Sequence, residues 1–148
     1  MARILAVSSG GGHWEQLMLL RGAFSSHDVI YANTIEGLAE KSGVAQATLI
    51  ADCNRDHPID NLRCARDLLG VVNRLRPHIV VTTGAAPGLL ALVIGKMFGA
   101  KVIWVDSVAN SERLSLSGKI ARQVADLHLT QWEHLAQDSR TEYLGGLL

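Results

Sequence analysis

The sequence predicts an α/β fold in which a doubly wound, mainly parallel sheet of six strands is covered by helices on both faces. Short apolar runs alternate with helix-length segments along all 148 residues. Two of these runs, IVV at 79–81 and VIWV at 102–105, are continuously apolar, which is typical of parallel strands that are buried on both faces. Strands and helices that alternate in this way are joined by right-handed crossovers.

Each element follows from the hydrophobic pattern. We expect strands at Ile4–Ser8, Asp28–Ala32, Ala47–Ile50, His78–Thr82, Lys101–Val105 and Leu127–Thr130. We expect helices at His13–Phe24, Ile35–Lys41, Ile59–Leu75, Pro87–Phe98 and Ser117–Val124, with a short one at Trp132–Gln137. No repeat or linker divides the chain, so residues 1–148 are predicted to form one Rossmann-like domain with the strand order 3-2-1-4-5. The last residues, 139–148, contain two glycines and an apolar end, and predict a segment that docks on a partner.

Composition and charge exclude several classes of protein. Fourteen basic residues balance fourteen acidic ones and only 5% of residues are aromatic, so nucleic acid is not an expected partner. Cys53 and Cys64 have no metal-site spacing, even with Asp52 and His57 nearby, and predict reduced thiols in a cytosolic protein. No signal peptide precedes the first strand, and lysines interrupt the longest apolar stretch, so we expect no membrane span.

The first loop, SSGGGHWEQL at residues 8–17, follows the first strand and opens a helix. A dinucleotide fingerprint needs a third glycine where Glu15 stands and an acidic residue after the second strand, where only Asn33 and Thr34 occur. A P-loop is excluded because no GK[ST] follows the glycines. The remaining interpretation is a nest of backbone N–H groups at a helix N-terminus, which favours a phosphate or diphosphate. With Gly12 as N-cap, Glu15 is predicted to close a capping box.

Two further loops follow the fourth and fifth strands. The fourth-strand loop reads TTGAAPG at 82–88, with Pro87 suited to the first turn of the next helix. The fifth-strand loop, 106–113, is long and polar, and Ser115 or Ser117 is expected to cap the helix after it. Because the carboxyl ends of parallel strands meet at one edge of the sheet, we expect all three loops to open onto one crevice. The charged residues of the last loop are equally compatible with simple solvation.

His13 is the one histidine in a glycine loop, at the start of the first predicted helix. The positive end of a helix favours the uncharged imidazole, which is suited to accept a proton from a sugar hydroxyl. A packing role, or donation of a hydrogen bond to phosphate, is the alternative. The apolar residues of the same helix predict either core packing or a membrane or partner contact; they are Trp14, Leu17, Met18, Leu20, Ala23 and Phe24.

Four segments carry a resemblance to a known family: SSGGGHWEQL, TTGAAPG, DSVANSERLSLSGKIARQVADLHLTQW and the terminal YLGG. They resemble the acceptor-side subunit of bipartite GT-B glycosyltransferases, that is, the eukaryotic asparagine-linked glycosylation subunit and its bacterial PssD-type relatives. The most specific positions are Ser115, Leu116, Ser117, Gly118, Lys119, Ala125, Asp126, Gln131 and Trp132. The order of the loops is also similar to the N-terminal half of MurG.

The resemblance implies an acceptor-binding domain in a two-component, inverting glycosyltransferase that is inactive alone. Such an enzyme moves a sugar from a UDP-sugar to a polyprenyl-diphosphate-linked saccharide, and the UDP-sugar is held mainly by a donor-binding partner subunit in a heterodimer. No cofactor is implied, and no metal is expected because the sequence has no DxD. The first strand begins too early for an N-terminal membrane helix, which favours a bacterial protein at the cytoplasmic face of the membrane, held there peripherally.

The resemblance also assigns roles to particular residues. His13 becomes the candidate catalytic base. The groups expected to hold the acceptor diphosphate are Gly10, Gly11, Gly12, Thr83, Gly84 and Ala85. The groups expected to line the acceptor cleft are Ser9, Asp106, Ser107, Asn110, Glu112 and Arg113. Asp106 departs from the family by being shorter than the Glu common at its position. Two alternatives stay open: a non-catalytic scaffold that activates a partner transferase, and a stand-alone Rossmann domain that binds a cofactor.

Overall fold

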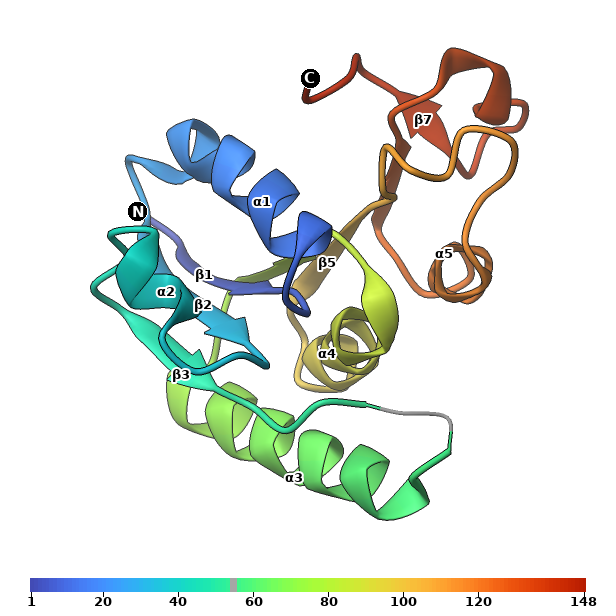
Figure 1. Ribbon diagram of the computed structural model, residues 1–148. Coiled ribbons are helices and arrows are strands. Elements are labelled where there is room, and N and C mark those ends of the chain that lie inside the picture. Colours follow the sequence, from blue (N-terminus) through green and yellow to red (C-terminus); the bar gives the residue numbers. More distant parts are fainter. Residues whose placement is uncertain (54–55) are drawn as a thin grey trace.

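The computed structural model describes residues 1–53 and 56–148 and contains one parallel sheet (Figure 1). Its seven strands lie in the order β3-β2-β1-β4-β5-β6-β7. Their bounds are β1 Arg3–Val7, β2 Asp28–Asn33, β3 Ala47–Leu49, β4 Ile79–Thr82, β5 Lys101–Val105, β6 Leu127–Thr130 and β7 Glu142–Tyr143. Every strand pair is parallel. The predicted 3-2-1-4-5 order is confirmed.

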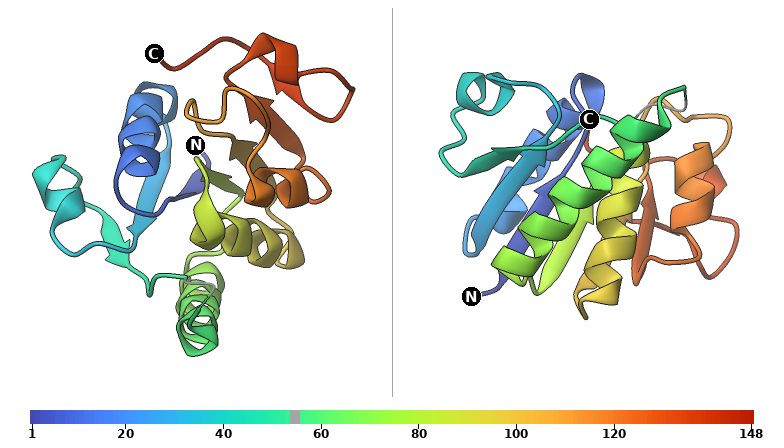
Figure 2. Two further views of the ribbon diagram at one scale, coloured as in Figure 1. Left: turned by 45° about the vertical axis from the view of Figure 1, so that its right-hand side comes forward. Right: turned by 90° about the horizontal axis from the view of Figure 1, so that it is seen from below.

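Helices cover both faces of the sheet (Figure 2). One face carries α1 Gly12–Leu19, the 3-10 helix η1 Leu20–Phe24 and α2 Leu38–Lys41. The other face carries α3 Pro58–Leu75, α4 Ala85–Met97 and α5 Leu116–Ala121. A single 3-10 turn, η2 Glu133–Leu135, follows β6. The chain is therefore doubly wound, as its alternating pattern predicts.

The alternation of side chains along β1 divides the core into two parts. Ile4 and Ala6 point to the α1 side, where they pack with Trp14, while Leu5 and Val7 pack with the helices of the opposite face. A strand that is buried on both faces in this way reads as a continuous apolar run. The two cores fix the carboxyl ends of β1, β4 and β5 side by side, and the loops of interest begin there.

Three predictions about the sheet and its helices need correction. A seventh strand, β7, pairs with β6 at the sheet edge, so part of the expected partner-docking tail lies on this chain's own sheet. Two residues are too short a strand to show any periodicity in sequence. The predicted first helix is α-helical only to Leu19, and α2 begins three residues late because Gly37 adopts a φ of 79° immediately before it.

Of the predictions about how helices begin, one is wrong and two are confirmed. Helix α1 begins after Gly11, which has a φ of 67°, and no side chain caps it, so the capping box predicted for Glu15 is wrong. Ser115 caps α5 as predicted: its Oγ accepts a hydrogen bond from the Gly118 N–H at 2.9 Å. Pro87 lies in the first turn of α4, where its missing N–H costs no hydrogen bond.

Two features of the helices bear on contact with a membrane: their length and the apolar face of α1. Among residues 1–53 and 56–148, no helix has both the length and the apolar character that a membrane crossing requires. On α1, Trp14 and Leu17 are buried, and Met18, Leu20 and Phe24 pack against the same core. The apolar face of the first helix therefore serves the core.

Candidate functional site

The loops after β1, β4 and β5 meet at the carboxyl edge of the sheet and enclose a cavity of about 170 Å³. We call it the loop cavity. Its lining residues are His13, Gly84, Ala85, Asp106, Ser107, Ala109, Asn110, Ser115 and Ser117. The predicted meeting of three loops at one crevice is thus found in the structure. This is the position at which open α/β sheets bind ligands.

His13 is held by a reciprocal pair of hydrogen bonds to the loop after β4. Its Nδ1 lies 3.0 Å from the carbonyl oxygen of Thr83, and the Thr83 hydroxyl donates to the His13 carbonyl. Because a carbonyl can only accept, Nδ1 carries the proton of the neutral ring. The Nε2 atom then holds a lone pair and can accept a proton. Thr83 is fully buried and His13 is half-buried, so the contact lies at the wall of the cavity.

The backbone beside the imidazole is unusual at two successive residues. Gly84 has a φ of 129°, and a Cβ atom on it would lie 2.9 Å from two ring atoms of His13. Ala85, a non-glycine residue, has a φ of 66°. Such conformations cost of order 1–3 kcal/mol each and cluster at functional sites. The backbone of Gly84 and Ala85 therefore determines where the imidazole of His13 packs against the loop after β4.

The glycine loop leads directly into α1. Gly10 lies against the side chain of Ile35, and Gly11 turns the chain with its positive φ. The first amides of an α-helix have no acceptor within the helix, and the helix dipole adds positive potential there. Gly12 and His13 supply these amides, and Gly12 is exposed. Ser9 is half-buried at the end of the strand.

Asp106 is buried, and its carboxylate organises the fifth-strand loop. Oδ1 accepts from Trp104 Nε1 at 3.0 Å and from Ser115 Oγ at 2.8 Å. Oδ2 accepts from Asn110 Nδ2 and from the Ser115 backbone N–H, both at 3.2 Å. The carboxylate thereby joins β5, the loop and the start of α5. It lines the loop cavity with its acceptor capacity already used by four donors.

Of the other predicted cleft residues, Ser107 and Asn110 line the loop cavity, whereas Glu112 and Arg113 are exposed and lie outside its lining. The sequence argument missed Ala109, Ser115 and Ser117 as lining residues. Ser115 and Ser117 are predicted as helix-cap candidates, and a cap residue at the start of α5 lies at the same carboxyl ends of the strands as the loops. That shared position is the signal that identifies them.

A second hollow adjoins the loop cavity along α1. This α1 groove has a volume of about 350 Å³, and it shares His13, Ser107 and Ala109 with the loop cavity. Its remaining lining residues are Gly12, Glu15, Gln16, Leu19, Val108 and Leu148. Leu19 and Leu148 are exposed. The groove therefore runs from the imidazole to the C-terminal segment of the chain.

Two buried glutamines missed by the sequence argument connect these parts. Gln16 on α1 donates to Ser107 Oγ at 3.1 Å and accepts from the Val108 N–H at 3.0 Å. Gln131 donates to Gln16 and to the carbonyl of Asp106. For Gln16 the sequence signal is a glutamine on the buried face of a helix, since such an amide needs buried partners.

Solved structures show where this fold occurs. The chain has the fold of one half of a GT-B glycosyltransferase: it superposes on MurG of Acinetobacter baumannii with a TM-score of 0.79 at 12% identity, covering 99% of this chain and 46% of that one. A UDP-N-acetylglucosamine 2-epimerase from Rickettsia bellii gives a TM-score of 0.75 at 14% identity, with 99% and 45% covered. The chain thus spans less than half the length of these structures.

Sequence comparison gives the family. The family described as "Oligosaccharide biosynthesis protein Alg14 like" matches residues 58–147, and this chain belongs to it. A "UDP-N-acetylglucosamine transferase subunit ALG14" of Mus musculus is 27% identical over 182 residues, which cover 99% of this chain and 83% of that protein. The protein of the same name from Eremothecium gossypii is 32% identical over 100 residues, covering 59% and 45%. The glycine loop lies outside the range of the family match.

Proposed function

We propose that this chain is the acceptor-binding subunit of a two-component, inverting glycosyltransferase. It binds a polyprenyl-diphosphate-linked saccharide and recruits a donor-binding subunit that holds the UDP-sugar. The observation that carries the proposal is the loop cavity, which His13 lines at the start of α1 with its Nδ1 held by the carbonyl of Thr83. Membership of a family whose relatives are named transferase subunits supports it.

The chemistry assigned to the cavity requires one proton transfer. The acceptor diphosphate binds the amides of Gly12 and His13 at the positive end of α1. The acceptor hydroxyl gives its proton to Nε2 of His13 as its oxygen attacks the anomeric carbon from the face opposite UDP. The bond from that carbon to the UDP oxygen breaks, and groups of the partner subunit stabilise the departing UDP. Thr83 and Gly84 keep the imidazole in the tautomer that this step needs.

The size of the cavity supports a shared active site. Ligand pockets usually enclose about 300–1,000 Å³, and the loop cavity alone is smaller, at about 170 Å³. A partner that covers the carboxyl edge of the sheet and the α1 groove would complete it. The C-terminal segment, with Leu144 and Leu148 both exposed, supplies apolar surface for that docking.

The outer face of α3 supports a peripheral contact with anionic lipid. Ile59, Leu62 and Leu69 recur along it at helical spacing with 64%, 71% and 41% of their surface exposed. Arg63 and Arg66 stand between them, and their side chains are 60% and 76% exposed. Buried apolar area and basic residues both strengthen the contact of a helix with an anionic membrane interface.

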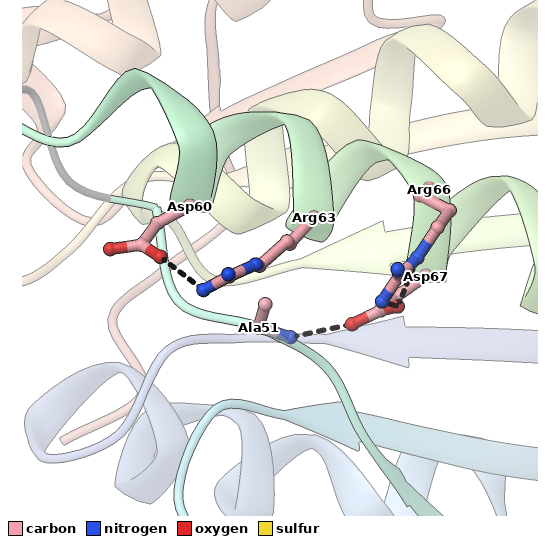
Figure 3. Close-up of polar contacts among 5 residues, drawn as sticks. All are labelled: Ala51, Asp60, Arg63, Arg66 and Asp67. Carbon is pink, nitrogen blue, oxygen red and sulfur yellow. Dashed lines mark hydrogen bonds and ion pairs between the residues drawn. The ribbon is translucent and has the colours of Figure 1, made fainter.

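Both acidic residues of α3 are paired with these arginines (Figure 3). Asp67 pairs with Arg66 at 3.0 Å, and its second oxygen accepts at 3.0 Å from the N–H of Ala51 in the segment between β3 and α3. Asp60 pairs with Arg63 at 3.3 Å, and an exposed ion pair of this kind contributes little to folding stability. Helix α3 begins at the carboxyl ends of the strands (Figure 2). The loop cavity lies at the same end of the sheet, so lipid contact at the start of α3 would bring the acceptor diphosphate to the site.

Reconstitution tests the function. The chain is co-expressed with its donor-binding subunit, and a panel of UDP-sugars is scanned against a polyprenyl-diphosphate-linked acceptor. We expect transfer only when both chains are present. Transfer by the partner alone, merely enhanced by this chain, would support the scaffold alternative. Tight calorimetric binding of NAD or FAD to the isolated chain would support the stand-alone cofactor domain instead.

Vesicle flotation tests the membrane contact. The complex should float with vesicles that contain anionic phospholipid, and the double variant Ile59→Gln/Leu62→Gln should lose most of that binding. Met97→Gln is the matched control, because Met97 is 74% exposed on α4 at the other edge of the sheet. Equal flotation of wild type and double variant, or no flotation of the wild-type complex, would remove α3 from this role.

A further inference from the structure

A continuous chain of hydrogen bonds runs from the C-terminal segment to the start of α1. The Leu147 N–H donates to Gln131 Oε1 at 3.1 Å, and Gln131 Nε2 donates to Gln16 Oε1. Gln16 Nε2 in turn donates to the carbonyl of Gly12 at 3.3 Å and to Ser107 Oγ at 3.1 Å. Gln16 and Gln131 are each 6% exposed, so the middle of this path is buried, while its two ends at Leu147 and Gly12 are partly buried.

The direction of the chain is fixed by its partners. Gln16 Oε1 also accepts from the Val108 N–H at 3.0 Å, so exchange of the oxygen and nitrogen of this amide would set two donors against each other. Gln131 Nε2 also donates to the carbonyl of Asp106 at 3.0 Å. Every amide in the path therefore accepts on the side of the C-terminal segment and donates toward α1. Hydrogen bonds in series polarise one another and strengthen.

The last acceptor in the path is the carbonyl of Gly12, which shares its peptide group with the N–H of His13. A peptide whose carbonyl accepts a hydrogen bond is a better donor at its N–H. The same residue carries the imidazole that binds Thr83. The path thus ends at the group on which the proposed chemistry depends. Its other end lies beside Leu148, which is 87% exposed and lines the α1 groove.

We propose that Gln16 and Gln131 are positioning residues that couple the C-terminal segment, residues 144–148, to the amide and imidazole of His13. A partner subunit that docks on this segment tightens or loosens the Leu147–Gln131 contact. The glutamine pair transmits that change to the start of α1. The inference rests on the proposed function only for its kinetic consequences, because the coupling itself belongs to the isolated chain.

The first test uses Leu147→Pro, which removes the donated N–H while the residue stays in place. Leu147→Ala is its matched control, since alanine keeps the N–H. Gln131→Met and Gln16→Met remove the side-chain amides of this hydrogen-bond path (the relay) with little change of volume. Gln46→Met is the control for the substitution, because Gln46 is exposed and lies outside the path. In the isolated chain, NMR of the His13 amide and ring nitrogens should show shifts in the Leu147→Pro, Gln131→Met and Gln16→Met proteins, with both controls unchanged.

The second test uses the reconstituted complex. The three relay variants should lower kcat by roughly ten- to a hundredfold, as displaced catalytic groups do, with the KM for the UDP-sugar unchanged. Combining Leu147→Pro with Gln131→Met should add little to either variant alone. Unshifted His13 signals in the folded Leu147→Pro protein would overturn the coupling, and a normal kcat of all three variants would overturn its role in catalysis. Shifted His13 signals in a chain that supports no transfer would keep the coupling and overturn the proposed function.

Discussion

The Nδ1 atom of His13 lies 3.0 Å from the carbonyl oxygen of Thr83, and the Thr83 hydroxyl donates a hydrogen bond back to the carbonyl of His13. These two residues are separated by 70 positions in the sequence and come from the loops after β1 and β4. Their reciprocal contact selects the ring tautomer with a free Nε2.

Gly84→Ala should move the imidazole. The new methyl group would lie 2.9 Å from the ring of His13, so the ring must leave its contact with Thr83. Turnover of the complex should fall by about a hundredfold, the order that a misplacement of about 1 Å can cost. Gly99→Ala is the matched control, because Gly99 also has a positive φ, 84°, but open space around the added methyl. Both variants should lose stability, and equal turnover of the two would contradict this view of Gly84.

Asp106→Asn should destabilise the fold rather than only the site. The amide replaces one oxygen of a buried carboxylate that accepts four hydrogen bonds, and sets an NH₂ group against donors such as Ser115. We expect a loss of about 2–4 kcal/mol in the free energy of unfolding, measured with urea. Glu133→Gln, an exposed change of the same kind, should alter it by less than about 0.5 kcal/mol. A small loss for Asp106→Asn would show that the loop does not depend on this carboxylate.

The free energy of unfolding should decrease as the pH is lowered below 6.5, because His128 is buried. Burial lowers the pKa of His128 below its ordinary value of 6.5, and the hydrogen bond with the Gly118 carbonyl and the charge of Asp106 offset this only in part. The unfolded chain therefore binds this proton first, so the contribution of the neutral ring is present above pH 6.5 and is lost as the pH falls. Urea titrations at several pH values measure the slope. The His128→Gln protein should show a shallower slope, and identical slopes would contradict the assignment.

The two cysteines should differ in reactivity toward iodoacetamide. A hydrogen bond from the Cys64 thiol lowers the pKa of Cys53, against burial and the charge of Asp52, which raise it. The same hydrogen bond, followed by burial, raises the pKa of Cys64. Native protein should be alkylated at Cys53 alone, and Cys64→Ala should move the pH profile of this labelling upward. Labelling of Cys64 in the folded protein would contradict the contact.

The fold was predictable from the sequence because the buried parallel strands and their turns carry strong local signals. The runs around Leu5, Val80 and Val102 mark strands that pack on both faces, and their alternation with helices leaves few topologies. The seventh strand was missed because Glu142–Tyr143 is defined by its neighbour β6 rather than by its own pattern. The start of α1 was misjudged because a positive φ at Gly11 replaced a side-chain cap.

The site was predictable as a meeting of loops but not as a set of contacts. Strand order alone brings His13, Gly84 and Asp106 to one edge of the sheet. Their hydrogen bonds depend on residues far apart in sequence, such as Gln16 and Gln131, 115 positions apart. No local pattern reports a contact of this range. The same reason explains why Cys53 and Cys64 carried no sequence signal for their contact.

The central claim is that His13 in the loop cavity takes the proton from the acceptor hydroxyl. The most direct measurement is kcat of the reconstituted complex with His13→Ala, compared with wild type and with His27→Ala as a control at the opposite edge of the sheet. Loss of a general base costs about 10²–10⁴ in rate, so we expect a drop of that size with the fold and the KM for the UDP-sugar retained. Near-normal turnover by a folded His13→Ala complex would contradict the claim.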